Sequence, residues 1–285
     1  MSLQLDARQR AMLKEMGVRV WLPASAAPAT TPVASVEPAP EPARAPAAPA
    51  AVPDAPRAVP RAATPPPPEP VVAEASPLQV RALPADIAAM DWDALQQAVA
   101  ACQACELCNS RKNTVFGVGD RRAQWLVVGE APGEQEDVQG EPFVGASGEL
   151  LDNMLKAVGL SRQGQGAAGA YIANVLKCRP PANRNPQLQE VLQCEPYLRR
   201  QVELLQPKLI LALGRFAVQA LLHDSGPAVA SQPLGKLRGQ IHRYQGVPVI
   251  VSYHPAYLLR SPQDKAKAWA DLCLAREILH GQDGA

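Results

Sequence analysis

Four short apolar runs in the second half of the chain constrain its fold more than any other feature. They are typical of buried strands and cover residues 125–129, 171–176, 209–213 and 248–252. Helical periodicity separates and follows them, at 147–158, 187–204, 215–223 and 264–280. Strands alternating with such helices favour a parallel sheet covered on both faces. The sequence therefore predicts an α/β fold, a three-layer α/β/α sandwich around a roughly four-stranded parallel sheet.

Two details of the helical segments can be predicted from single residues. Asp91 is a suitable N-cap for a short helix over 93–101, which would deliver Cys102. Pro196 interrupts the pattern at 187–204, so we expect that helix to kink or split there.

The region before this domain has a different composition. Residues 23–84 hold 18 of the 30 prolines, are rich in alanine and contain no aromatic residue. Such a segment buries too little apolar surface to offset its loss of conformational entropy, which predicts a disordered linker. We therefore divide the chain into a possible partner-binding helical peptide (1–22), this linker (23–84) and a folded domain (85–285).

Charge and cysteine usage limit the possible functions. The net charge is +1, and the domain after the linker holds 20 basic and 20 acidic residues, so DNA binding would depend on a local basic patch. No run of 18 apolar residues predicts a membrane span, and residues 1–22 lack a signal-peptide core. We expect a cytoplasmic protein, in which six cysteines are thiols or metal ligands in preference to disulfides.

Polar residues follow two of the predicted strands at their carboxyl ends. Glu130 lies in the Gly/Pro-rich turn 129–133, and His254 begins the segment 254–260. Open α/β sheets place their ligand sites at this edge. A carboxylate and an imidazole from distant parts of the chain therefore predict one active site, although a lone histidine is more often a satisfied core residue.

Two further residues have both a structural and a functional interpretation. Asn174 lies in an otherwise apolar strand, and a buried amide needs hydrogen-bond partners, so it is either a structural staple or a ligand reader. Phe143 lies in a loop bounded by Pro142 and Gly145 instead of on a helical face. It is either a core residue or an aromatic platform for a ligand.

Four cysteines have a spacing that is compatible with a metal site. Cys102 and Cys105 form a CxxC pair, Cys178 follows 73 positions later, and Cys194 follows after 16 more. A zinc site, a redox pair and an iron–sulfur cluster all remain open on spacing alone.

These motifs together resemble the family 4 uracil-DNA glycosylases, which carry an iron–sulfur cluster. The resemblance covers about residues 92–270 and includes Gly129-Glu130-Ala131-Pro132-Gly133, Lys177-Cys178-Arg179-Pro180-Pro181 and His254-Pro255. It implies a structural 4Fe-4S cluster on Cys102, Cys105, Cys178 and Cys194, with Cys108 and Cys273 as non-ligands. It also implies a monofunctional hydrolase that acts in base excision repair, cleaving the N-glycosidic bond of a flipped-out deoxyuridine to leave an abasic site.

The resemblance also implies roles for individual residues. Glu130 would position water or oppose positive charge on the sugar, and His254 would bond uracil O2 as the base leaves as an anion. Family 1 enzymes carry aspartate where Ala131 stands, which leaves the activation of water open. The uracil-binding set would comprise Gly129, Ala131, Glu136, Phe143 and Asn174. Asn174 would read N3–H and O4, and Glu136 would disfavour thymine's methyl group.

A DNA-binding set follows from the same resemblance. Leu258 or Leu259 would wedge into the base stack, and Arg260, Lys265 and Arg184 would contact DNA. Lys236, Arg238 and Arg243 are further candidates for the basic patch, with a solvated face as the simpler interpretation. The alternative function is a replisome adaptor that binds uracil-DNA covalently or without catalysis. The loop 179–184 lacks the histidine of the covalent class, which favours turnover.

Residues 8–21, ending in Met16-Gly17-Val18-Arg19-Val20-Trp21, resemble the N-terminal peptide of the psi subunit of DNA polymerase III. This resemblance implies the chi subunit as a partner of residues 1–22. The simpler interpretation is that the segment packs on the domain itself. We expect a monomer.

Overall fold

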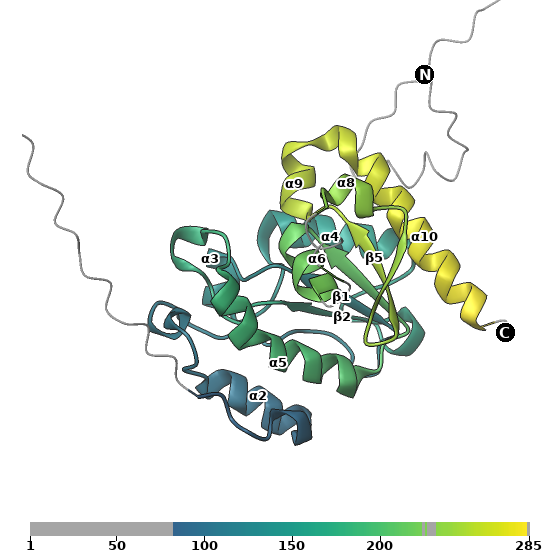
Figure 1. Ribbon diagram of the computed structural model, residues 1–285. Coiled ribbons are helices and arrows are strands. Elements are labelled where there is room, and N and C mark those ends of the chain that lie inside the picture. Colours follow the sequence, from purple (N-terminus) through teal and green to yellow (C-terminus); the bar gives the residue numbers. More distant parts are fainter. Residues whose placement is uncertain (1–81, 224–225, 227–231, 284–285) are drawn as a thin grey trace, which may run out of the picture. The chain divides into compact units, whose positions relative to one another are not determined.

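A five-stranded sheet forms the centre of the protein (Figure 1). The computed structural model describes residues 82–223, 226 and 232–283, so the predictions for 1–22 and almost all of 23–84 lie outside the described residues. The strand order is β2-β1-β3-β5-β4. The strands are β1 (Trp125–Gly129), β2 (Ala170–Asn174), β3 (Leu209–Leu213), β4 (Ile241–Tyr244) and β5 (Val247–Ser252).

The four predicted strands are confirmed and run parallel, in the register Trp125↔Ala170, Trp125↔Leu209 and Ile210↔Val249. The fifth strand was not predicted. β4 pairs antiparallel with β5 at the sheet edge, and three of its four residues are at least partly exposed. Because an edge strand with one solvated face carries polar residues such as His242 and Arg243, it lacks the continuous apolar run that identified the other strands.

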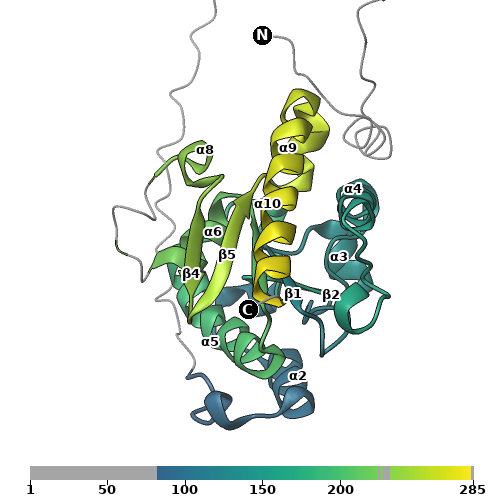
Figure 2. The same ribbon diagram turned by 90° about the vertical axis from the view of Figure 1, so that its right-hand side faces the viewer.

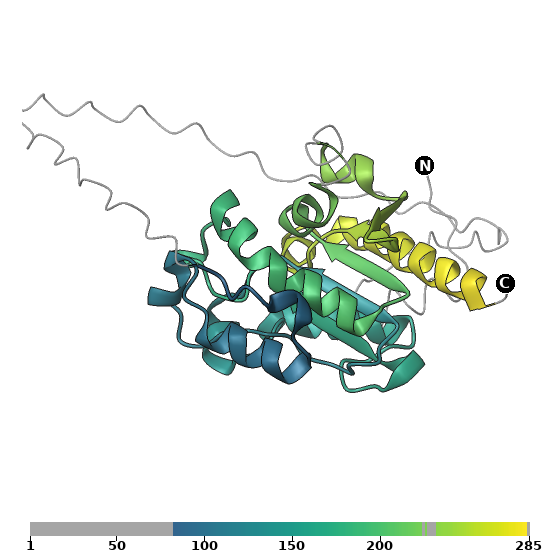
Figure 3. The same ribbon diagram turned by 60° about the horizontal axis from the view of Figure 1, so that its bottom comes forward.

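Helices cover both faces of the sheet, as predicted. One face packs against α2 (Trp92–Ala101), α5 (Leu188–Leu205) and α6 (Arg215–Leu222), and Figures 1 and 3 show α2 beside α5. The other face packs against α4 (Gly145–Ala157), α9 (Pro255–Arg260) and α10 (Lys265–Asp283), with α10 in the foreground of Figure 2. Alternating side chains of each strand enter the two cores. In β1, Leu126 and Val128 face the first core, whereas Trp125 and Val127 face the second.

Local signals account for the helix boundaries. The Asp91 side chain accepts a hydrogen bond from Ala94 N at 2.8 Å and caps α2 as predicted. The predicted split at Pro196 does not occur, because α5 continues through it. The carbonyl that loses its partner there belongs to Leu192, which is half exposed, so water can satisfy it. Among the described residues, no helix is long and apolar enough to cross a membrane.

The strand order creates a crevice at the carboxyl edge of the sheet. The chain passes from β1 outward to β2 on one side, then returns to β3 on the other side of β1. Connections that leave in opposite directions part above such a point, and open α/β sheets bind ligands there. The carboxyl ends of β1, β2, β3 and β5 lead directly to Glu130, Val175, Gly214 and Tyr253.

Candidate functional site

A cleft of about 1170 Å³ opens at this edge of the sheet. Its volume exceeds the usual range of about 300–1,000 Å³ for small-molecule sites, leaving room for a nucleotide with its flanking backbone. Eight residues predicted for the site line it together: Glu130, Ala131, Glu136, Phe143, Asn174, Arg184, His254 and Arg260. Residues predicted for the site from distant parts of the sequence thus lie together in one cleft.

Gly129, predicted for the uracil-binding set, is buried and does not itself line the cleft, but two side chains of the lining approach its backbone. A Cβ atom at this position would lie 2.4 Å from both Asn174 Oδ1 and Phe143 Cζ. Gly129 is the partner of Asn174 in the β1–β2 register, which explains the proximity. Any larger residue would therefore displace the amide or the ring.

Asn174 ends β2 with its side chain almost fully buried, at 2% exposure. Within the described part of the chain, its side-chain amide forms no hydrogen bond, although it lines the cleft. The amide atoms are not among the fully buried side-chain atoms without a partner in the described chain, so they reach the cleft, and this geometry favours the ligand-reading interpretation over the structural staple.

Phe143 is held in a strained conformation at the wall of the cleft. Its φ is +53°, a left-handed value that is uncommon outside glycine, and its ring is buried. Arg162, which was not predicted, donates to Pro142 O at 3.1 Å and to Phe143 O at 2.9 Å, and pairs with Asp152. These bonds offset the strain and fix the ring, whose centroid lies 5.3 Å from that of His254 with the planes 25° apart.

His254 is neutral and in a defined tautomer. Burial lowers its pKa to about 4, and the charge of Arg260 acts in the same direction. Its Nδ1 accepts a hydrogen bond from Ala256 N at 3.2 Å, capping α9. A neutral imidazole that accepts at Nδ1 carries its proton on Nε2. His254 therefore offers an uncharged N–H donor.

Glu130 faces an arginine that the sequence analysis missed. Burial raises the pKa of Glu130, while the nearby charge of Arg215 opposes that rise. Arg215 is exposed, lines the cleft and lies over the Phe216 ring at 4.8 Å. Arg215 begins α6 two residues after β3 ends, so the rule that selected Glu130 and His254 would have found it too.

Glu136 has a structural contact in addition to its place in the cleft. It lies in α3 (Glu134–Gln139), and its Oε2 accepts a hydrogen bond from Gly133 N at 3.1 Å. This bond stabilises the turn that carries Glu130, as in a capping box. Glu136 thus lines the cleft and also stabilises the turn at its edge.

The predicted DNA-binding residues divide into two groups. Arg260 lines the cleft and Leu259 is 43% exposed, but Leu258 is fully buried in the core, so Leu258 cannot be the wedge in this conformation. Arg184 lines the cleft while pairing with the buried carboxylate of Glu190. Lys265 lies outside the cleft lining.

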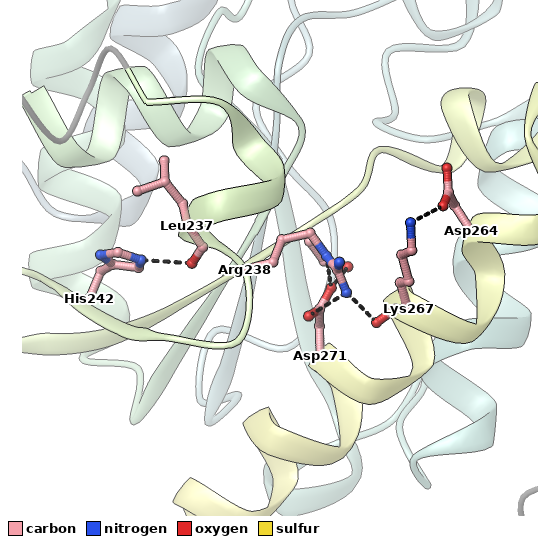
Figure 4. A network of polar contacts seen from close by, with 7 residues as sticks. Leu237, Arg238, His242, Asp264, Lys267 and Asp271 are labelled. Carbon is pink, nitrogen blue, oxygen red and sulfur yellow. Dashed lines mark hydrogen bonds and ion pairs between the residues drawn. The ribbon is translucent and has the colours of Figure 1, made fainter. Parts of the chain in front are cut away.

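Arg238 is a structural residue instead of part of a phosphate-binding patch. It forms two hydrogen bonds with the buried Asp271, at 2.7 and 2.9 Å, and a third with Lys267 O (Figure 4). Asp271 also accepts from Ser252 Oγ at 2.7 Å. This network ties α10 to the end of β5, two residues before His254.

A second, smaller cavity is lined by sulfur. Five cysteines border it, namely Cys102, Cys105, Cys108, Cys178 and Cys194. Among the described residues, no three histidine, cysteine or acidic side chains are arranged to hold a single metal ion. The thiols thus surround a space instead of converging on one point. Cys108, predicted as a non-ligand, directs its thiol to Asn109 Oδ1 at 3.4 Å.

Hydrogen-bond donors point at two of these sulfurs. Arg111 Nη1 donates to Cys178 Sγ at 3.1 Å, and Lys177 N donates to Cys194 Sγ at 3.2 Å. Burial raises the pKa of Cys178 to about 11 and raises that of Cys194 as well. A bound metal centre would reverse this effect, because coordination deprotonates a thiol.

Comparisons with known proteins agree with this geometry. The pattern that defines the Uracil DNA glycosylase superfamily matches residues 116–273. The Type-4 uracil-DNA glycosylase of Archaeoglobus fulgidus is 45% identical over 174 residues, which cover 60% of this chain and 84% of that protein. The Type-4 enzyme of Thermotoga maritima is 37% identical over 174 residues (61% and 85%). The Type-5 enzyme of Pyrobaculum aerophilum is 35% identical over 150 residues (49% and 64%). The chain belongs to the uracil-DNA glycosylase superfamily.

Proposed function

We propose that this protein is a uracil-DNA glycosylase that hydrolyses the N-glycosidic bond of flipped-out deoxyuridine and leaves an abasic site for base excision repair. The proposal depends on one observation, that Asn174 and His254 line the same cleft. Asn174 offers a donor and an acceptor that line the cleft with no partner in the described chain, and His254 offers a neutral Nε2–H donor in the same cleft. Uracil presents matching groups on its N3, O4 and O2 edges.

Asn174 selects uracil over cytosine by the direction of its hydrogen bonds. Its Oδ1 accepts from uracil N3–H and its Nδ2 donates to O4, whereas cytosine presents an acceptor and a donor at these positions. Phe143 stacks against the base, and Glu136 lies near the edge that carries thymine's methyl group. The close approach of Gly129 to the amide and the ring fixes the depth of this pocket.

Two groups act on the bond that breaks. The C1′–N1 bond cleaves with its electron pair going to uracil, and His254 Nε2–H stabilises the charge that develops on O2. Because His254 is uncharged, it stabilises this anion without first burying a cation. Glu130 orients the water that adds to C1′ and opposes positive charge on the sugar. The proton released by that water goes to the departing uracil or to solvent.

The DNA strand lies along the exposed cations of the cleft. Arg215 and Arg260 contact the phosphates around the flipped nucleotide, Arg184 and Lys265 add contacts further along, and Leu259 fills the vacated stack. Arg215 also offsets the acidic residues that line the same cleft.

Cys102, Cys105, Cys178 and Cys194 would hold a 4Fe-4S cluster in the cysteine cavity. The donor set fits this group because the thiols surround a cavity, and because Arg111 and the Lys177 backbone supply the N–H donors that stabilise thiolate sulfur. The cluster would supply structural cross-linking between the residues after α2, the turn after β2 and helix α5.

The activity is tested with a single-uracil oligonucleotide, single- and double-stranded, by detecting free uracil and the abasic site. We expect both products from uracil strands and neither from matched thymine strands. The Asn174→Asp variant should lose preference for uracil over cytosine by roughly tenfold or more, because a carboxylate cannot donate to O4. Tight binding without uracil release would instead support the adaptor function.

Iron and sulfide analysis, with the visible spectrum, tests the cluster. We expect iron in the wild-type protein and in Cys108→Ser, but a large loss in Cys105→Ser. Equal iron content in the two variants would reject the ligand assignment, and zinc in place of iron would reject the cluster.

We also propose that the protein is a monomer and that residues 1–22 bind the chi subunit of DNA polymerase III. The support is the sequence resemblance alone. Deleting residues 1–22 should abolish chi binding and leave the melting temperature of the domain unchanged. A lower melting temperature with unchanged chi binding would show that the segment packs on the domain.

A further inference from the structure

Lys177 is a fully buried lysine that the proposed chemistry does not use. It is 1% exposed, lies in the turn after β2 and lines the cysteine cavity. Its Nζ donates to Asn174 O at 2.8 Å and to Gln201 Oε1 at 2.6 Å. Burying an ammonium is costly, so a position that retains one must gain specific hydrogen bonds in return.

The first of these bonds orients the residue that reads the base. Asn174 is the last residue of β2, and the next two N–H groups, of Val175 and Leu176, bond to Gly129 O and Glu130 O. The peptide that follows Asn174 is thus held at its N–H by Gly129 O, and the Lys177 ammonium donates to its carbonyl oxygen. This bond fixes the peptide that follows Asn174 and thereby limits the rotation of the Asn174 backbone that carries the amide.

The second bond anchors the ammonium to α5. Gln201 is fully buried, and its Nε2 donates to Phe116 O at 2.9 Å and to Tyr171 Oη at 3.4 Å. Gln201 is thereby held by the loop before β1 and by β2. The Lys177 ammonium thus donates both to the fixed amide of Gln201 and to the carbonyl of Asn174, which it orients.

We propose that Lys177 is a positioning residue that holds Asn174 in place for uracil recognition, through the chain Gln201–Lys177–Asn174. The proposal rests on the proposed function, in which Asn174 reads the base. Lys177 touches neither substrate nor reacting atoms. Its removal should therefore weaken the recognition of the base while leaving contacts with the DNA backbone intact.

The test compares the affinities of Lys177→Met for two oligonucleotides, measured by fluorescence anisotropy. One contains 2′-fluoro-deoxyuridine, whose electron-withdrawing fluorine slows bond cleavage, and the other contains an abasic analogue. We expect the variant to bind the fluoro-uridine strand roughly tenfold more weakly than wild type. The abasic strand should bind equally well, and the exposed Lys112→Met should behave as wild type. Equal weakening for both strands, or no weakening, would overturn the proposal.

A double variant separates positioning from stability. In Lys177→Met/Gln201→Leu both partners of the buried Nζ–Oε1 bond become apolar, which should restore only part of any lost melting temperature, because Phe116 O and Tyr171 Oη then lose their Gln201 donor. Weak recognition of the fluoro-uridine strand should persist, because no side chain then donates a hydrogen bond to the Asn174 carbonyl oxygen. Recovery of recognition together with stability would show that Lys177 acts through folding alone, and loss of iron from Lys177→Met would assign it to the cysteine site instead.

The same assay distinguishes failure of the proposed function. If wild-type protein does not prefer the fluoro-uridine strand to the abasic strand, base reading itself is wrong, and the role of Lys177 fails with it. If wild type prefers it and Lys177→Met shows the same preference, only the positioning role fails.

Discussion

The cleft and the cysteine cavity both border the end of β2 and the turn after it, yet their side chains are used in opposite ways. In the cleft, the polar groups of Asn174 and His254 keep bonding capacity that no described residue uses. At the cavity, Arg111 and the Lys177 backbone donate to cysteine sulfurs that the protein itself provides. Unused hydrogen-bonding capacity is typical of a site that meets a ligand, and committed donors are typical of a site that holds a permanent group.

This contrast also explains how the two sites tolerate burial. His254 and Glu130 have pKa values shifted toward their neutral forms, mainly because of burial. The pKa values of Cys178 and Cys194 are raised for the same reason, but coordination to a metal centre would lower them again. Substitutions in the cleft should therefore change activity first, and those in the cavity should change stability first.

The largest stability effect should come from the cavity. Cys194→Ser removes the buried thiol on α5 that is proposed as a cluster ligand, and we expect it to lower the free energy of unfolding by more than about 4 kcal/mol. The check is chemical denaturation of the purified protein with its iron content recorded. An unchanged denaturation midpoint together with lost activity would contradict this prediction, because Cys194 would then affect activity before stability.

The largest activity effect should come from Gly129→Ala. The added methyl group would collide with Asn174 Oδ1 and Phe143 Cζ, and a displacement of this kind reduces turnover by roughly 100-fold. The readout is kcat/KM for uracil release. Gly235→Ala is a matched control, because its nearest contact would be Tyr253 Oη at 3.9 Å. Activity close to wild type in Gly129→Ala would show that the uracil pocket lies elsewhere.

A smaller effect is expected at the rim of the cleft. Arg215→Gln should weaken binding of a single-stranded oligonucleotide a few-fold and reduce the slope of log affinity against log salt by about one. Arg122→Gln, whose side chain is 79% exposed outside the cleft lining, should leave the slope unchanged. Equal slopes for Arg215→Gln and wild type would exclude a phosphate contact.

The smallest effect concerns pH. Because the pKa of His254 is lowered to about 4, the imidazole stays neutral as the pH falls, and kcat/KM should show no His254 inflection between about pH 8 and pH 5. The unfolded chain binds this proton first, so His254 should destabilise the fold progressively below about pH 6.5. An inflection near 6.5 that disappears in His254→Gln would show that the histidine is protonated during turnover.

The parallel strands, the two layers of helices and eight of the residues that line the cleft could be predicted from the sequence. Apolar runs identify β1, β2, β3 and β5, and their carboxyl ends locate Glu130 and His254. Other features depend on tertiary contacts. Leu258 and Leu259 are adjacent and chemically equivalent, and only the packing of α9 decides that Leu258 is buried. Arg238 has the composition of a phosphate ligand, but its pairing with Asp271 requires residues 33 positions apart to meet.

The most direct test of the central claim is the single-turnover rate of uracil release by wild type and His254→Ala at equal iron content. We expect the variant to lose roughly 100- to 1,000-fold in rate, because it lacks the donor that stabilises the departing base. Its melting temperature and visible spectrum should match those of wild type. A variant that releases uracil at the wild-type rate would contradict the account, since the N-glycosidic bond would then be cleaved without the His254 donor.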